Sequence, residues 1–203
     1  MKVVIIKYNA GNIMSVEYGL RRLGIDPILT NDYETIKSAD KVIFPGVGEA
    51  STTMEYLRAR GLDTLIYNLK QPVLGICLGM QLMCSYSEEG DTKCIGIFDE
   101  PVKRFIPVPP HKNPAGYWLK VPHMGWNNLH GVTGDIFDES LEGEYVYFVH
   151  SYYVPVGNDT IAKTEYINTF SAALQKANFY ATQFHPEKSG PVGEQILKRF
   201  LAI

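Results

Sequence analysis

The sequence predicts an α/β fold: a mostly parallel central sheet flanked by helices, with an antiparallel β portion added in the second half. In the first half, short runs of branched apolar residues alternate with segments whose apolar residues recur at helical spacing. From Gly96 to Ala181 the pattern changes to short strand-like runs separated by turns. The alternation indicates parallel strands joined by right-handed crossovers, whereas the closely spaced runs indicate antiparallel pairing.

Four apolar runs of the first half are expected to form strands, at residues 3–6, 25–29, 42–44 and 73–76. The helices expected between them lie at residues 13–23, with Gly24 as the stop, at 50–59, at 62–69 and from Met80 onward. The third strand is expected to be broken by residues 45–48, Pro-Gly-Val-Gly. Because sites form at the carboxyl ends of parallel strands, the loops after Ile6 and Phe44 should share one sheet edge with Cys77.

The second half is expected to contain strands at residues 103–108, 117–121, 145–149, 161–164, 171–175 and 179–184. A closing helix should bury one apolar face, made of Val192, Ile196, Leu197, Phe200 and Leu201. Residues 107–116 are rich in proline and predict a surface loop to which we assign no role. No linker separates the two halves, so residues 1–203 are expected to form a single domain.

The net charge, the length of the apolar runs and the cysteine spacing exclude several classes of function. The net charge of −3, without a long basic cluster, excludes a nucleic-acid or anionic-membrane footprint, and no apolar run is long enough to span a bilayer. The three cysteines lack metal-site spacing, which indicates reduced thiols in a cytoplasmic protein without a metal. No motif calls for a cofactor.

One stretch carries the spacing of a nucleophile elbow, Gly75-Ile76-Cys77-Leu78-Gly79, with cysteine where hydrolases place serine. A nucleophile on a tight strand-to-helix turn must be exposed, and side chains two residues away on either side would crowd that turn. The helix that follows favours the thiolate, because its N-terminus carries partial positive charge. The simpler alternative is a buried cysteine at the end of a core strand.

A cysteine nucleophile needs a base and a group that orients the base. Of the five histidines, His185 is the best placed, because it follows a strong strand and Pro186 keeps the chain extended there. Glu187 lies two residues on, so both side chains can leave the same face of an extended segment. The alternative is a strand-end histidine next to an unrelated surface glutamate.

The segments Gly75-Ile76-Cys77-Leu78-Gly79-Met80-Gln81 and His185-Pro186-Glu187 resemble the class I, triad-type glutamine amidotransferases, whose sheet is flavodoxin-like. Within that class, the resemblance is strongest to the glutaminase subunits that serve histidine biosynthesis. It rests on four further segments: Tyr8-Asn9-Ala10-Gly11-Asn12, Pro45-Gly46-Val47-Gly48, Pro122-His123-Met124-Gly125-Trp126-Asn127 and His150-Ser151-Tyr152-Tyr153. The resemblance covers nearly the whole chain.

The resemblance implies that Cys77 attacks the carboxamide of glutamine, His185 transfers protons and Glu187 orients His185. Leu78 is expected to supply one backbone N–H to the oxyanion hole, and the loop at Val47 and Gly48 the other after a peptide flip. Glycines on both sides of Val47 make that flip sterically easy. The hole is therefore expected to be closed in the resting enzyme.

The resemblance also places the substrate and a partner. Glutamine is expected to contact Gly46, Gln81, Glu89, His150, Ser151 and Tyr152. Ammonia should pass to a separate (β/α)8-barrel cyclase that makes imidazole glycerol phosphate and AICAR, and the two chains should form a heterodimer. Its contact surface is expected at Asn12, Met124, Trp126, Tyr147 and Lys188. One departure is Lys7, where this family often has an acid, and it bears only on the loop that follows.

Three alternatives stay open at this point. The chain could feed ammonia to another pathway, although residues 122–127 favour histidine biosynthesis. It could be a catalytically silent interaction subunit, against which the retention of Cys77, His185 and Glu187 speaks. It could also be a hydrolase without a partner, using the same triad on esters or peptides.

Overall fold

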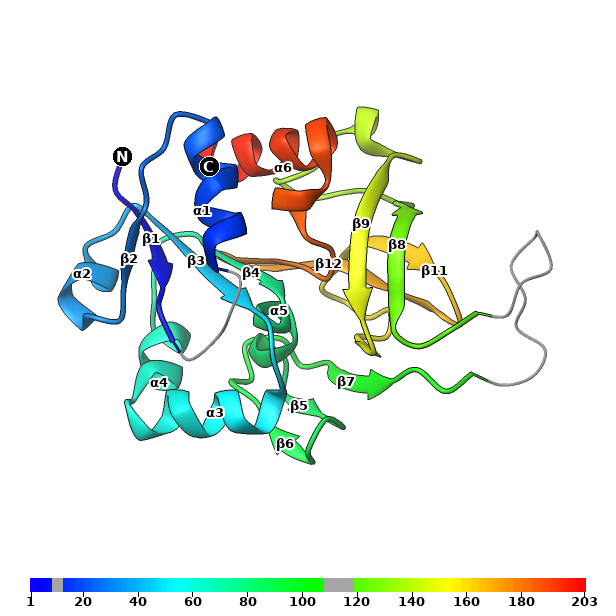
Figure 1. Ribbon diagram of the computed structural model, residues 1–203, viewed down its shortest axis with the longest axis horizontal. Helices are drawn as coiled ribbons and strands as arrows, with labels where there is room; N and C mark the ends of the chain where they lie inside the picture. Colours follow the sequence, from blue (N-terminus) through cyan, green and yellow to red (C-terminus); the bar gives the residue numbers. More distant parts are fainter. Residues whose placement is uncertain (9–12, 108–118) are drawn as a thin grey trace.

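A computed structural model describes residues 1–8, 13–107 and 119–203. Its main sheet has seven strands in the order β11-β12-β13-β4-β3-β1-β2 (Figure 1). Five of them are parallel: β1 (Val3–Ile6), β2 (Ile28–Thr30), β3 (Lys41–Gly46), β4 (Val73–Cys77) and β13 (Phe179–Thr182). Strand β12 (Thr169–Lys176) pairs antiparallel with β13, and β11 (Thr160–Glu165) pairs antiparallel with β12 at the edge of the sheet. The predicted fold class is thus confirmed.

Helices cover both faces of the sheet. The chain forms α1 (Ile13–Arg22), α2 (Tyr33–Lys37), α3 (Ala50–Ala59), α4 (Leu62–Tyr67), α5 (Leu78–Met83) and α6 (Gly190–Ala202). Side chains alternate along β1, so Val4 and Ile6 join the core under α3, α4 and α5, whereas Val3 and Ile5 join the core under α1 and α6. The buried strands are continuously apolar because both faces are covered.

Two smaller sheets stand beside the main one. Strands β10 (Tyr152–Tyr153), β7 (Pro101–Arg104), β5 (Tyr86–Ser87) and β6 (Thr92–Lys93) form one, and β8 (His123–Asn128) pairs with β9 (Tyr145–His150) in the other. Short 3₁₀ turns lie at η1 (Glu139–Leu141) and η2 (Pro186–Lys188). Within the described ranges, no helix is long and apolar enough to cross a membrane.

The structure corrects several expected boundaries. Strand β3 is not broken at residue 45, because Pro45 and Gly46 pair with Ile76 and Cys77 of β4. Strand β2 begins only at Ile28, after Pro27. No strand forms over the described residues 119–121, and the strand instead runs through β8, whose mixed burial hid it from a hydrophobic pattern. The loop at residues 107–116 lies almost wholly outside the described residues.

Candidate active site

Cys77 ends β4 and immediately precedes α5, so the expected elbow is formed. Its backbone has φ of 55° and ψ of −110°, a conformation that L-residues rarely adopt. The turn is stabilised from both sides because β4 lies between β3 and β13. Cys77 is only 8% exposed, yet it lines a cavity, and its Sγ lies 3.8 Å from the carbonyl oxygen of Val149.

The glycines around Cys77 have a steric reason. A Cβ on Gly75 would lie 2.6 Å from Sδ of Met83, and a Cβ on Gly79 would lie 2.0 Å from the carbonyl oxygen of Phe44. Helix α5 therefore packs directly on the backbone of β3. Only glycine permits that approach, so the crowding expected from the elbow motif is present.

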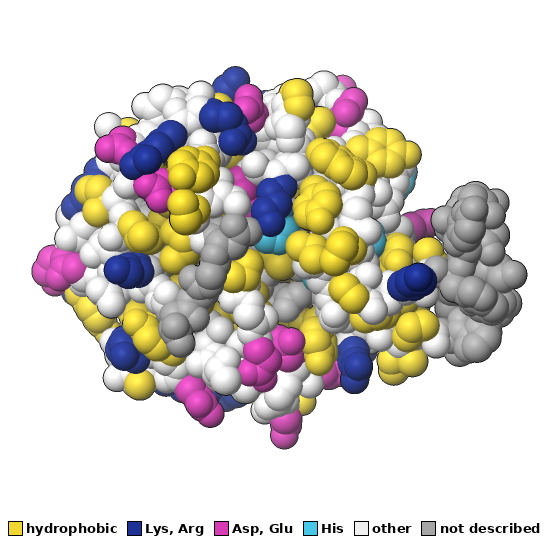
Figure 2. Space-filling model, viewed as in Figure 1, with side chains coloured by type: hydrophobic (Ala, Val, Ile, Leu, Met, Phe, Trp, Pro, Cys, Tyr) yellow, Lys and Arg dark blue, Asp and Glu magenta, His cyan; other side chains and the backbone are white. Residues whose placement is uncertain are grey.

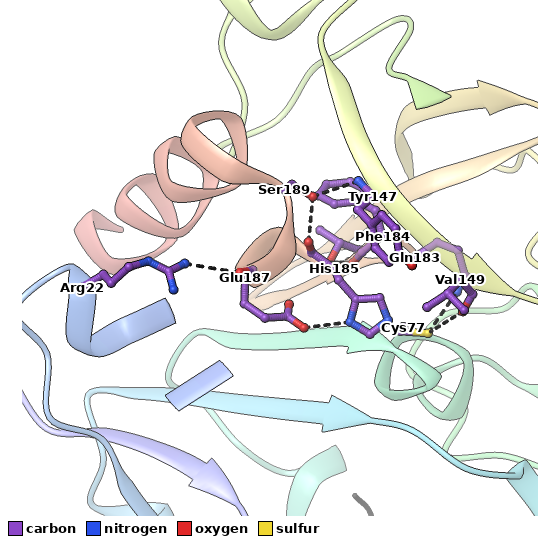
Figure 3. A network of polar contacts seen from close by, with 10 residues as sticks. Arg22, Cys77, Tyr147, Val149, Gln183, Phe184, His185, Glu187 and Ser189 are labelled. Atoms are coloured by element: carbon purple, nitrogen blue, oxygen red, sulfur yellow. Dashed lines mark hydrogen bonds and ion pairs between the residues drawn. The ribbon is translucent and has the colours of Figure 1, made fainter. Parts of the chain in front are cut away.

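His185 lies between Glu187 and Cys77 (Figure 3). Its Nδ1 is 2.8 Å from Oε1 of Glu187, and both side chains are buried. Its other nitrogen, Nε2, has no hydrogen-bond partner among the described residues and lies on the side of Cys77. Burial lowers the pKa of His185, but Cys77 and Glu187 outweigh burial and raise it, which favours the imidazolium.

Neighbouring elements hold this imidazole in place. The hydroxyl of Ser189 donates to the carbonyl oxygen of His185 at 2.7 Å and accepts from the N–H of Tyr147 at 3.0 Å. Arg22 of α1 donates to the carbonyl oxygen of Glu187 at 3.3 Å. Gly19, also on α1, leaves room for Glu187, because a Cβ there would lie 3.0 Å from the Cβ of Glu187.

A cavity of about 350 Å³ opens in front of Cys77. The lining residues come from the ends of β3, β4 and β9 and from the segments beside them: Val47, Gly48, Cys77, Leu78, Gln81, Glu89, Pro122, Val149, His150, Ser151, Tyr152 and His185. Every predicted oxyanion-hole residue is in this set, as are the predicted substrate residues except Gly46. Side chains far apart in the sequence therefore converge on one site.

Gly46 is not among the lining residues of this cavity, and a Cβ there would be 2.2 Å from the backbone nitrogen of Gly79. Gly48 has φ of +115°, and a Cβ there would meet no described atom within 4 Å. Tyr8 is buried beside this segment, and its hydroxyl donates to the carbonyl oxygen of Pro45. Burial, and secondly the nearby Cys77, raise the pKa of Tyr8, so it stays a neutral donor.

His150 makes a buried pair with His123 of β8. Nδ1 of His123 lies 3.0 Å from Nε2 of His150, and Nδ1 of His150 lies 2.7 Å from the carbonyl oxygen of Tyr152. Because a carbonyl only accepts, Nδ1 of His150 carries the proton and its Nε2 accepts from His123. Burial lowers the pKa of His123 to about 4, and burial with the neighbouring imidazole lowers that of His150 to about 3.

Glu89 follows β5 and borders the same cavity. Its Oε2 accepts from the N–H of Ala50 at 2.9 Å. Burial raises the pKa of Glu89 and nearby Glu49 adds to the rise, whereas the Ala50 N–H opposes it. A carboxylate at the cavity edge suits an ammonium group.

The predicted contact surface lies on one hairpin and one turn. Met124 and Trp126 of β8 are 63% and 55% exposed, and the ring of Trp126 packs edge-on against Tyr147 at 6.0 Å. Tyr147 and Lys188 are half-buried. Figure 2 shows apolar side chains gathered over β8 and β9 beside the histidines. Asn12 lies outside the described residues, and Lys7 is exposed after β1.

Sequence reasoning missed four residues that the structure brings to the site: Tyr8, His123, Gln183 and Ser189. Tyr8, His123 and Gln183 stood inside segments quoted for other reasons, and Ser189 two positions after Glu187. Tyr8, His123 and Gln183 have partners distant in the chain, and Ser189 donates to a backbone carbonyl, so the spacing of side chains gives no signal for them.

The description "Glutamine amidotransferase class-I" belongs to the family model that matches residues 4–203. The chain therefore belongs to the class I glutamine amidotransferase family. It is 61% identical, over all 203 residues and the full length of the relative, to imidazole glycerol phosphate synthase subunit HisH of Bacteroides fragilis. It is 46% identical to the subunit of the same name from Pectobacterium atrosepticum, with 99% of each chain covered. The resemblance inferred from the motifs is confirmed.

Solved structures share the fold at much lower identity. A putative GMP synthase subunit from Thermoplasma acidophilum superposes with a TM-score of 0.73 at 20% identity, covering 100% of this chain and 93% of the other. A glutamine amidotransferase from Thermotoga maritima gives a TM-score of 0.63 at 15% identity, covering 100% and 83%. These likenesses support the fold alone.

Proposed function

We propose that this chain is the glutaminase subunit of imidazole glycerol phosphate synthase and supplies ammonia to a (β/α)8-barrel cyclase in histidine biosynthesis. The observation that carries the proposal is that Cys77 and His185 line a cavity sized for an amino acid, with Glu187 buried behind His185 and in contact with its Nδ1. The subunits of that name, at 61% and 46% identity over essentially the whole chain, support the same assignment.

The residues suggest the following steps. The thiol proton of Cys77 passes to Nε2 of His185, and the sulfur attacks the carboxamide carbon of glutamine. The tetrahedral intermediate collapses as His185 gives the proton to departing ammonia, leaving a glutamyl thioester on Cys77. Water, deprotonated by His185, then hydrolyses the thioester to glutamate and the free thiol. The raised pKa of His185 favours the form that holds the transferred proton.

The developing oxyanion needs two preorganised donors, and losing one costs about 10²–10³ in rate. The N–H of Leu78, at the start of α5, is one candidate, and the Gly46–Val47 peptide or the N–H of Gly48 is the other. A Cβ on Gly48 would meet no described atom within 4 Å, and glycine adopts positive φ at little cost, which suits a loop that reorients. We propose that the partner completes the hole by turning this loop.

The amino-acid end of glutamine is proposed to face Gln81 and Glu89. The carboxylate of Glu89 accepts from the α-ammonium, and the backbone of His150, Ser151 and Tyr152 holds the α-carboxylate. These groups line the same cavity as Cys77 and His185.

The cyclase is proposed to dock on the hairpin of β8 and β9 around Met124 and Trp126. Met124 and Trp126 are both more than half exposed, and large apolar side chains of this kind are enriched in protein–protein interfaces. The three free cysteines suit a reducing compartment, and we propose a cytoplasmic protein without nucleic-acid or membrane partners.

The test is glutamate release from glutamine by the chain alone and with the cyclase subunit plus its nucleotide ligand. We expect weak activity alone and a strong increase with the liganded partner. Cys77→Ala should abolish release, whereas Cys94→Ala, a matched change at a buried cysteine outside the cavity, should not. If no glutamate is released even with the partner present, the proposed catalytic activity is wrong. If the isolated chain is already fully active, the proposed control by the partner is wrong.

A further inference from the structure

Two glutamine side chains meet in the interior next to Cys77. Gln81 projects from α5, and Gln183 follows β13, two residues before His185. Gln183 is fully buried and Gln81 nearly so. Their amides are hydrogen-bonded to each other, with Nε2 of Gln81 2.9 Å from Oε1 of Gln183. An amide buried this deeply must have a defined orientation, because a wrong one leaves donors facing donors.

A backbone carbonyl decides the orientation of both amides. The carbonyl oxygen of Tyr152 lies 3.0 Å from the terminal amide of Gln81 and accepts there, so the atom of Gln81 facing it is Nε2. The same Nε2 also faces Gln183, so the atom that Gln183 presents is its acceptor, Oε1. The other arm of Gln183 is then Nε2, which lies 3.8 Å from Sγ of Cys77.

Both amide hydrogens of Gln81 are used in these bonds. Its Oε1 is the only polar atom of that side chain left for a ligand, and Gln81 lines the cavity. An oxygen there accepts from an ammonium group, whereas a flipped amide would present hydrogens and repel it.

We propose that Gln183 is a positioning residue: it locks the amide of Gln81 so that Oε1 faces the cavity and accepts from the α-ammonium of glutamine. This inference rests on the proposed function. With its second arm, Gln183 donates to the sulfur of Cys77. One buried side chain thus links recognition of the amino-acid end to the nucleophile.

The experiment measures kcat/KM in the complex with the cyclase for glutamine and for glutaramate, which is glutamine without its α-amino group. Gln183→Met keeps the length of the side chain but removes the acceptor that faces Gln81. The ratio of kcat/KM for glutamine over glutaramate should fall about tenfold, the loss that one hydrogen bond to a charged group accounts for. A purely structural defect would lower both substrates equally and leave the ratio unchanged.

Gln183→Glu retains an oxygen opposite Nε2 of Gln81 and replaces the donor to the sulfur. The substrate ratio should stay within about twofold of wild type, whereas the acid limb of Cys77 alkylation by iodoacetamide should move to higher pH. Thr182→Val is the matched control, because Thr182 is the buried residue directly before Gln183, at the end of β13, and donates to the Phe184 carbonyl at 3.0 Å. It should leave both the substrate ratio and the alkylation profile at wild-type values.

An unchanged ratio in Gln183→Met would overturn the proposal. If Gln183→Met does not fold, the test passes to Gln183→Glu. A lowered ratio of kcat/KM for glutamine over glutaramate in that variant, or an unchanged pH profile of Cys77 alkylation, would overturn the proposal. The wild-type complex separates this outcome from failure of the proposed function, since wild type without glutamate release would refute that function instead.

Discussion

The α-carbon of Gly79 lies against the carbonyl of Phe44, so that a Cβ on Gly79 would approach the Phe44 oxygen to 2.0 Å. Through this contact the first turn of α5 packs against β3. The packing fixes the position of Cys77 relative to the loop after β3. The elbow and the candidate oxyanion loop are therefore one packed unit.

Gly79→Ala should move the elbow at Cys77 away from the loop after β3. A methyl group cannot fit at 2.0 Å from a backbone oxygen, so α5 must shift away from β3. A misplacement of about 1 Å at a catalytic group costs roughly 100-fold in rate. We expect at least that loss in partner-stimulated glutamate release, with a lowered melting temperature by circular dichroism.

Gly96→Ala is the control for this change. Gly96 has φ of +82°, but its Cβ would meet no described atom within 4 Å. Alanine there should cost only the backbone strain of about 1–2 kcal/mol and leave the activity of the folded protein intact. Equal activity of the two variants would contradict the packing argument.

Alkylation should distinguish Cys77 from the other two thiols. Burial, followed by nearby Cys94, Glu100 and Asp159, raises the pKa of Cys84 well above its ordinary value, and burial raises that of Cys94 to about 12. Because only a thiolate reacts, Cys77 should label at least about 100-fold faster with iodoacetamide near neutral pH. Peptide mapping by mass spectrometry measures the three rates.

All three cysteines should react at similar rates once the chain is unfolded in guanidinium. A glutamine-like diazo-ketone should label Cys77 alone in the presence of the partner. If Cys84 or Cys94 of the native protein is labelled as fast as Cys77, the predicted selectivity for Cys77 is wrong.

The neutral pair His123 and His150 should make the protein sensitive to mild acid. Their pKa values are lowered to about 4 and about 3, chiefly by burial, against about 6.5 in the unfolded chain. Below about pH 6.5 the unfolded state binds more protons, so the stability present above that pH is lost as pH falls toward the folded values. Each histidine adds a slope of up to about 1.4 kcal/mol per pH unit.

Urea unfolding at several pH values between about 6 and 5 measures this slope. His123→Gln should reduce it, whereas His130→Gln should not, because the side chain of His130 is half exposed in a surface pair with Glu142. His185, whose pKa is raised, is largely protonated in both states over this window and contributes little. Equal slopes for wild type and His123→Gln would argue against the buried pair as the cause.

Trp126→Ala should weaken the complex with the cyclase. The indole is 55% exposed and packs on Tyr147, which fits an interface anchor, and truncating such an anchor typically costs about 2 kcal/mol or more. We expect a dissociation constant raised at least about 30-fold by calorimetry. Glutaminase stimulation should be recovered at saturating partner.

Tyr67→Ala supplies the comparison, since Tyr67 is 53% exposed on α4, away from the hairpin of β8 and β9 (Figure 1). Its loss should leave the affinity unchanged. Should both substitutions weaken binding equally, the docking surface would have to be sought elsewhere.

Prediction from the sequence succeeded where the signal is local. The buried run of β1, the period of α1 up to Gly24 and the elbow at Cys77 each depend on residues within one turn or one strand. It failed at β8, because a strand that carries a histidine, an exposed methionine and a glycine has no alternation to detect. The proline and glycine at positions 45 and 46 predict that β3 ends at Phe44, and yet both residues pair with β4.

The sequence by itself determined the fold class through hydrophobic periodicity, and it identified the candidate triad through two short segments, the elbow at Cys77 and His185-Pro186-Glu187, which carry the family resemblance. Only the tertiary structure decided how the amides of Gln81 and Gln183 are oriented, why His150 is neutral and what holds Pro45. Each of these depends on a hydrogen-bond partner at least 27 residues away in the chain. Which group donates and which accepts depends on a partner that only folding brings near, and the order of residues along the chain does not identify that partner.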